Sequence, residues 1–158
     1  MTIYAFEAQE SWLQTVAGRV CSAVEVEEAT LHLHFGATQL DEDGMLAAER
    51  TVSMHGVWRI ERAEDIVAGA GDLESTGATS RLAFITGATL ERFEVSQPGF
   101  DLDLFFSGQV VVRSFPCNSR EYAEDDDIED DADVTVSWWI DGVGVPDDWE
   151  EPYDPPGI

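Results

Sequence analysis

The stretch SWLQTVAGRVCSAVEV (Ser11–Val26) is repeated in outline as SRLAFITGATLERFEV (Ser80–Val95). At a constant offset of 69 residues the copies share a leucine, a glycine and the final Glu-Val pair. LHLHF (Leu31–Phe35) then corresponds to LDLFF (Leu102–Phe106), with two extra residues in the turn that precedes the second copy. Because a length difference confined to a turn is typical of two related hairpins, the sequence predicts an internal repeat.

Each copy predicts a short helix followed by an antiparallel hairpin. The expected helices cover residues 9–17 and 80–86, and each ends at a glycine that can adopt a left-handed cap conformation. The expected hairpin strands are residues 20–26, 30–35, 89–96 and 101–106. In the second strand of each hairpin, apolar side chains occupy every other position, so we expect one buried face and one exposed face.

Four more strands complete the predicted fold, at residues 46–52, 57–61, 109–115 and 134–140. HGVWRIE (His55–Glu61) and VSWWID (Val136–Asp141) are each expected to be the tryptophan-bearing closing strand of its own half. The predicted fold class is α+β and β-rich, with two pseudo-symmetric repeats of a short helix plus antiparallel strands. A sandwich and a partly closed barrel are both compatible with this pattern.

We expect a single domain over residues 1–158. Its first repeat covers about 9–62, a linker about 63–78, and the second repeat about 79–141. Residues 142–158 form an acidic, proline-rich tail, which we expect to be extended or disordered.

Acidic residues dominate the charge of the chain. Thirty-three Asp and Glu face eight basic residues, all of them arginine, and the formal net charge is −25. We expect no direct binding to DNA, RNA or an anionic membrane, because phosphate binding needs clustered Lys and Arg. Such a surface favours rapid, salt-sensitive capture of a basic protein. The alternative is that the acids only keep the protein soluble.

The strongest acidic signal lies in EYAEDDDIEDDADVTVSWWID (Glu121–Asp141), where eight of the ten residues from Glu124 to Asp133 are acids. Alternation in the strand that follows predicts Trp138 in the core and its neighbour Trp139 on a polar face. The tail adds aromatic residues among further acids. The predicted partner-binding residues are Asp125, Asp126, Asp127, Asp130, Asp131, Trp139, Trp149 and Tyr153.

Catalytic motifs are absent from the sequence: it holds no GxSxG, HExxH, GxxxxGK[ST] or helix-opening GxGxxG. We therefore expect no enzyme, no catalytic residue and no cofactor. His32 and His34 have the spacing of some metal sites, but such a site needs a third ligand nearby. The alternative is that they are the exposed partners of the apolar residues in their strand. DEDG (Asp41–Gly44) predicts a hairpin turn, and Cys21 a small core residue.

Nothing at the N-terminus resembles a signal peptide, and no apolar stretch reaches the roughly 18 residues of a membrane span. These features favour a bacterial-type cytoplasm as the location.

A helix tipped with small residues, followed by G…VEV…LxLxF and by a strand ending in VWRI, resembles a group of small, acidic, uncharacterised bacterial proteins. These proteins are regarded as immunity proteins, which neutralise toxins. The resemblance covers most of residues 11–115 and brings no catalytic residues. It implies a non-enzymatic protein that occludes a basic partner such as a toxin nuclease. Two alternatives remain open: a nucleic-acid mimic that modulates DNA-binding proteins, and a salt-adapted domain without a charged partner.

Overall fold

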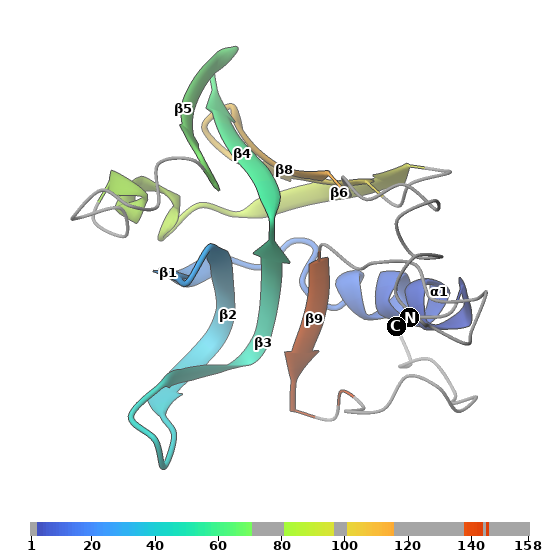
Figure 1. The fold of residues 1–158 in the computed structure, drawn as a ribbon, viewed down its shortest axis with the longest axis vertical. Helices are drawn as coiled ribbons and strands as arrows, with labels where there is room; N and C mark the ends of the chain where they lie inside the picture. The colour runs from blue at the N-terminus through green and yellow to red at the C-terminus, as the bar shows by residue number, and fades with distance from the viewer. Residues whose placement is uncertain (1–2, 71–80, 97–100, 116–137, 144, 146–158) are drawn as a thin grey trace, which may run out of the picture.

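The structure is a computed structural model that describes residues 3–70, 81–96, 101–115, 138–143 and 145. Its strands form two antiparallel sheets, stacked in a sandwich-like arrangement (Figure 1). The four-stranded sheet has the order β1-β2-β3-β9 and the five-stranded sheet the order β5-β4-β8-β7-β6. Among the described residues these strands close no barrel.

The four-stranded sheet contains β1 (Cys21–Glu27), β2 (Thr30–Leu40), β3 (Leu46–His55) and β9 (Trp138–Gly142). The five-stranded sheet contains β4 (Val57–Arg62), β5 (Asp65–Gly69), β6 (Leu90–Ser96), β7 (Asp101–Phe106) and β8 (Val110–Phe115). The helical residues within the described ranges belong to α1 (Ile3–Leu13) and the 3₁₀ turn η2 (Ala83–Ile85), and Arg81 is helical as well. The structure thus confirms a β-rich fold with few helices.

The first helix differs from its predicted bounds. α1 begins earlier than expected and ends at Leu13, after which Thr15 and Val16 donate to Trp12 and Leu13 in tight turns. Of the second predicted helix, the structure describes residues 81–86, where Arg81 is helical and Ala83–Ile85 forms the 3₁₀ turn η2 with Ile85 buried. In both cases the predicted glycine lies beyond the helix, where its positive φ turns the chain into the next strand.

The two predicted hairpins are confirmed, and they pair in the same way. β1 and β2 place Val24 opposite Leu33, while β6 and β7 place Phe93 opposite Leu104. Each hairpin also contains an irregularity at its first pairs, between Cys21 and Ala23 in one and between Leu90 and Arg92 in the other. The predicted turn at Asp41–Gly44 is also present, between β2 and β3.

The two tryptophan-bearing strands each join the sheet of the other half, which differs from the expectation. β3 and β4 are separated by the turn at Gly56, whose φ of +86° redirects the chain, so that β4 pairs with β8. β9 follows β8 in the chain order of described strands but pairs with β3. In the two ladders Trp58 lies opposite Ser114 and Trp138 opposite Met54. We call this arrangement the strand exchange.

The segment expected to link the halves begins with β5, an edge strand that pairs with β4. Its burial pattern leaves Ile66 and Val67 exposed and buries Ala68. Short strands without a clear alternation are hard to distinguish from a linker, and this one was missed for that reason.

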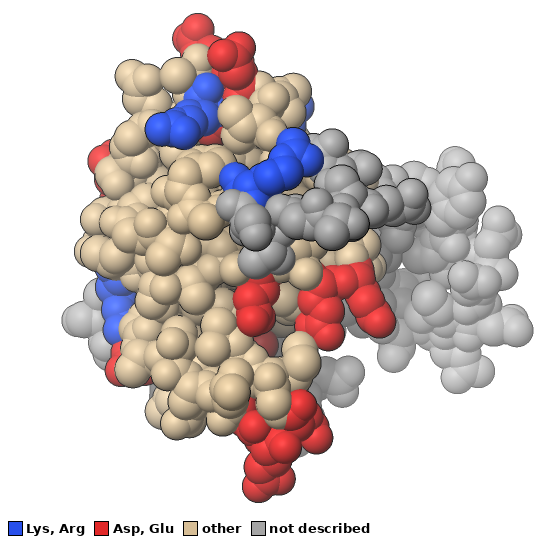
Figure 2. Space-filling model, turned by 90° about the vertical axis from the view of Figure 1, so that its left-hand side faces the viewer, with Lys and Arg blue, Asp and Glu red and all other residues tan. Residues whose placement is uncertain are grey.

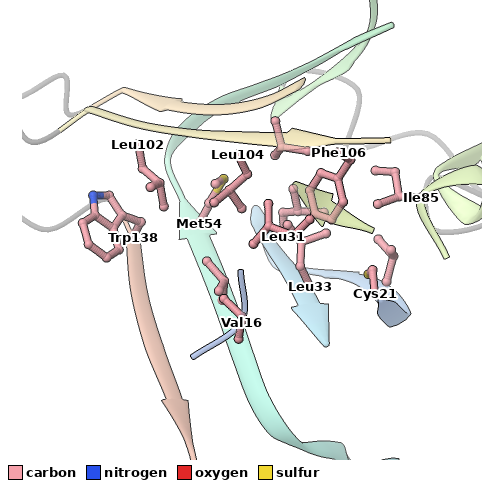
Figure 3. Packing of buried hydrophobic residues seen from close by; sticks show 14 of the residues in the cluster. Val16, Cys21, Leu31, Leu33, Met54, Ile85, Leu102, Leu104, Phe106 and Trp138 are labelled. Atoms are coloured by element: carbon pink, nitrogen blue, oxygen red, sulfur yellow. The ribbon is translucent and has the colours of Figure 1, made fainter. Parts of the chain in front are cut away.

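The core lies between the inner faces of the two sheets. Figure 3 shows leucines of β7 directed towards Met54 and Leu31 of the other sheet. Phe35 and Phe106 stack with ring centroids 6.3 Å apart. Cys21 is fully buried in this cluster, which confirms the prediction of a core cysteine.

A backbone junction joins the two halves at one end of this core. Val20 forms an isolated antiparallel bridge with Thr89. The amide of Gly18 donates to the carbonyl of Leu90 at 2.6 Å, and the amide of Gly87 donates to the carbonyl of Cys21 at 2.8 Å. The junction thus fixes the start of β1 against the start of β6.

None of the helices in the described ranges is long and apolar enough to cross a membrane.

Candidate functional site

The outer face of the four-stranded sheet carries polar side chains from all four strands. These residues alternate with the core-facing positions of β1, β2, β3 and β9. We call this surface the histidine face, and its residues are Glu25, Glu27, His32, His34, Thr51, Ser53, Trp139 and Asp141.

His34 is held between its two neighbouring strands. Its Nδ1 lies 2.8 Å from the hydroxyl of Thr51, and its Nε2 lies 3.3 Å from a carboxylate oxygen of Glu25. The residue is 2% exposed, so the expectation of an exposed histidine is wrong here. Cross-strand hydrogen bonding explains the burial, because a polar ring inside a protein needs partners for both nitrogens.

His32 repeats this arrangement one pair further along the ladder. Its Nδ1 lies 2.7 Å from the hydroxyl of Ser53, and its Nε2 lies 4.0 Å from Glu27. The two imidazole rings stack with centroids 6.3 Å apart. Burial, followed by the charge of His34, lowers the pKa of His32, while Glu27, Glu25 and Asp141 partly oppose the shift.

The chemistry open to this network is limited by burial. A hydroxyl, an imidazole and a carboxylate in sequence resemble the groups of a hydrolytic triad. However, Ser53 is 1% exposed and Thr51 is 6% exposed, so neither hydroxyl is presented to a substrate. The described residues include no group of three His, Cys, Asp or Glu side chains that could hold a metal ion. The network therefore serves to fix β1, β2 and β3 to one another.

Trp139 is the one predicted partner-binding residue that falls within the described ranges. It lies on β9 opposite Ser53, on the histidine face as predicted, and it is half-buried. The other predicted residues, which lie outside the described residues, are Asp125, Asp126, Asp127, Asp130, Asp131, Trp149 and Tyr153.

The histidine face carries acidic side chains from β1 and β9. It holds the carboxylates of Glu25, Glu27 and Asp141, and no arginine is among its residues. Glu25 and Glu27 approach the histidines instead. The carboxylates of this surface favour the approach of a cationic group.

The outer face of the five-stranded sheet has the opposite character. We call it the arginine face, and its residues are Arg59, Glu61, Arg92, Glu94, Asp103, Phe105, Val111, Arg113 and Phe115. Arginines there are paired with acids and lie over phenylalanine rings, as Arg92 does over Phe105 at 3.7 Å from the ring centroid. A hollow of about 770 Å³ opens beside this ring.

Glu61 is the centre of the ion pairs on the arginine face. It accepts hydrogen bonds from the guanidinium groups of Arg113 and Arg59, and Arg113 also donates to Asp103 at 2.7 Å. Burial acts to raise the pKa of Glu61, but the hydrogen bonds and charges of Arg113 and Arg59 outweigh it and lower the pKa. The arginines of this face are thus already satisfied within the protein.

Acidic side chains are spread over the face of the molecule that Figure 2 shows. They lie in separate groups at the top, at the left edge and towards the bottom of the view, with uncharged atoms over most of the area between them. On this face the acids therefore form local acidic regions instead of one continuous patch.

Comparison with known proteins gave no match: no family model, no curated protein and no solved structure is similar to this chain.

Sequence reasoning missed the pairing of the histidines with Ser53 and Thr51. The signal was present in the alternation of the two strands. Once β2 and β3 are joined by a turn at Asp41–Gly44, the register places a hydroxyl residue opposite each histidine.

Proposed function

We propose that this protein is a non-enzymatic binding protein that occludes a basic protein partner, as an immunity-type inhibitor would occlude a toxin nuclease. The histidine face is the proposed binding surface, in the setting of a bacterial-type cytoplasm. The proposal is supported by the net charge of −25 and by the contrast between the two outer faces.

The observation that carries this proposal is that the acidic side chains on the outer faces of the two sheets have different ion-pair partners. On the arginine face, Arg113 is paired with Glu61 and Asp103. On the histidine face, the ion pairs of Glu25 and Glu27 within the described part of the chain are with His34 and His32. A cationic partner can therefore gain new charge-assisted contacts on the histidine face without displacing an existing arginine.

Trp139 supplies the apolar part of the proposed surface. Acids steer the encounter between proteins, while a few large side chains provide most of the binding energy. A half-buried tryptophan has enough contact area for this role, and its position on β9 is fixed by the β3 ladder. The acid-rich run predicted to bind the same partner lies outside the described residues.

We also infer that the two halves of the domain are copies of one structural unit, as the sequence repeat predicts. The support is geometric. Corresponding residues pair identically in the two hairpins, and Gly18 and Gly87 donate to Leu90 and Cys21 in matching hydrogen bonds. On this view the histidine face and the arginine face are equivalent surfaces that have diverged.

The test of the proposed function is affinity capture from the host lysate at low and high salt, with Trp139→Ala and Phe105→Ala variants. Phe105 is the matched control, because it is a partly buried aromatic residue on the arginine face. One stoichiometric basic protein that is lost with Trp139→Ala but retained with Phe105→Ala supports a dedicated inhibitor. Equal capture by both variants contradicts the assignment to the histidine face.

The two alternatives give different outcomes in the same measurement. A nucleic-acid mimic captures several DNA-binding proteins and releases them in salt. A salt-adapted domain captures none, and its free energy of unfolding rises steeply with salt as self-repulsion is screened.

A further inference from the structure

The turn between β2 and β3 lies at the end of a ribbon that extends beyond the rest of its sheet. β1 pairs with β2 only as far as Phe35, and β9 pairs with β3 only from Arg50 onwards. Between them, Thr38–Leu40 pairs with Leu46–Ala48, and no described strand lies on either side. Figure 1 shows this ribbon projecting from the body of the protein. We call residues 36–49 the ribbon.

The turn of the ribbon is closed by hydrogen bonds of the side chain and backbone of Asp41. One carboxylate oxygen of Asp41 accepts hydrogen bonds from the amides of Asp43, at 2.9 Å, and Met45, at 2.8 Å. The backbone amide of Asp41 also donates to the carbonyl of Met45. The tip is therefore preorganised, which reduces the entropy lost when a partner binds it.

The base of the ribbon is held by an ion pair. Arg19 contacts the carboxylate of Glu49 at 2.5 Å, and both side chains lie against Gly36 on the neighbouring strand. Gly36 has a φ of +87°, and a Cβ there would lie 2.5 Å from the Glu49 carboxylate. The ribbon thus leaves the sheet at a defined position.

Apolar side chains are exposed on this ribbon. Leu40 is 70% exposed and Met45 is 41% exposed, on either side of the turn. An isolated two-stranded ribbon gains little stability by itself, so it offers no internal reason to place large apolar groups in water. A contact with another surface would bury both side chains.

The charge of the ribbon specifies the chemistry of that surface. Residues 36–49 contain four acids and no basic residue, and the acid at the base, Glu49, is already paired with Arg19. In Figure 2 the lowest point of the molecule, where this turn lies, carries acidic side chains. Glu42 and Asp43 are exposed there. A cationic surface complements these carboxylates, and an anionic one is repelled.

We propose that the ribbon docks into a groove of the basic partner that is lined with arginine or lysine and floored with apolar side chains. Leu40 and Met45 fill the apolar floor, and Glu42 and Asp43 face the cationic walls. This inference rests on the proposed function and names a second contact surface for the same partner. It requires no change in the ribbon, whose turn and base are already fixed.

The test is an NMR titration of the full-length protein, labelled with ¹⁵N, with a short peptide of alternating arginine and leucine. A peptide of alternating serine and leucine serves as the uncharged probe. We expect saturable shift changes at the amides of residues 38–48 with the cationic peptide, and much smaller changes with the uncharged one. Replacing Leu40 and Met45 together by serine should weaken the affinity about tenfold, as expected for loss of apolar contacts.

A matched control variant is available at the start of β5. Ile66 is 66% exposed and follows the acids Glu64 and Asp65, but it lies on the other sheet. Ile66→Ser should leave the affinity for the cationic peptide unchanged. Shift changes that are absent from residues 38–48, or that survive the double serine variant, would overturn the inference.

The outcomes also separate this inference from the proposed function. In one outcome, a basic protein is captured in a Trp139-dependent way while the ribbon amides show no shift changes in the titration. That result supports the proposed function and contradicts the ribbon contact. If the amide shifts of the ribbon depend on protein concentration in the absence of peptide, the ribbon binds a second copy of this chain. That result also overturns the inference. Specific peptide binding at the ribbon with no captured protein supports the docking site and contradicts a dedicated inhibitor.

Discussion

Trp138 lies directly opposite Met54 in the β3–β9 ladder, and both side chains are fully buried. This pair fixes β9 to the sheet from the inside, and it also determines which side Trp139 occupies. Because successive side chains of a strand point to opposite faces, burial of Trp138 places Trp139 on the histidine face. The two adjacent tryptophans therefore have separable roles.

Replacing each tryptophan by alanine should reveal this separation. Trp138→Ala should reduce the free energy of unfolding by about 3–5 kcal/mol, because it leaves a large cavity in the core. Trp139→Ala should reduce it by about 1 kcal/mol, in the range of ordinary partly exposed positions. Urea unfolding of both variants at neutral pH measures the difference. A Trp139→Ala variant as unstable as Trp138→Ala would show that Trp139 is structural, and the proposed surface would lose its apolar anchor.

Gly142 tests how closely β9 packs against β3. A Cβ at this position would lie 2.0 Å from the carbonyl oxygen of Glu49, and the φ of Gly142 is +141°. Gly142→Ala should therefore cost more than about 3 kcal/mol, since the backbone itself must move. Gly108→Ala is the control, because its φ of +78° is also positive but no atom lies within 4 Å. It should cost only about 1 kcal/mol, and equal losses in thermal unfolding would contradict the predicted clash.

The stability of the protein should depend on pH through His32. Its pKa is lowered in the folded protein, so the unfolded chain binds the proton more readily. Stability from this residue is present above the ordinary value of 6.5 and decreases as the pH falls through the lower folded value. His32→Gln should therefore lose less stability than the wild type between neutral and mildly acidic pH. The urea midpoints of both proteins over this pH range measure the effect. A difference between the two midpoints that stays constant over the range would contradict it.

Cys21 should be unreactive in the folded protein. Burial raises the pKa of its thiol from 9.0 to about 11, an effect partly opposed by hydrogen bonds to the backbone of Ala23 and His34. The other cysteine of the chain is Cys117, which is replaced in a Cys117→Ser variant so that only Cys21 can react. In this variant a thiol reagent at pH 8 should label Cys21 only after unfolding in urea. Because burial disfavours the thiolate in the folded protein, the contribution of Cys21 to the free energy of unfolding is present below pH 9.0. It disappears as the pH rises towards 11. Rapid labelling of the folded protein would show that the β1 end of the core opens.

The hairpins could be predicted from sequence because each carries strict alternation and a clear turn signal. Leu31, Leu33 and Phe35 are all buried as expected, and so are Leu102, Leu104 and Phe106. Alternation reports which face of a strand is buried, and this information is local. The buried tryptophans of the two closing strands follow from the same rule.

The sheet to which a strand belongs is not a local property, and here the prediction failed. Sequence order suggested that β4 closes the first sheet, but the turn at Gly56 sends it to β8. The burial of His34 was missed for a related reason, since its partners Thr51 and Glu25 come from two other strands. Most of the predicted site lies outside the described residues, so only Trp139 could be placed.

The strand exchange has a consequence for how the chain is made. Arg50 donates a hydrogen bond to the carbonyl of Val143, 93 residues further along the sequence. During translation, β3 emerges from the ribosome long before β9 is available to cover its edge. An uncovered edge is a template for pairing with other chains, and contacts over long sequence separations form slowly. Until the last strand arrives, this edge of the nascent protein is therefore open to pairing with other chains.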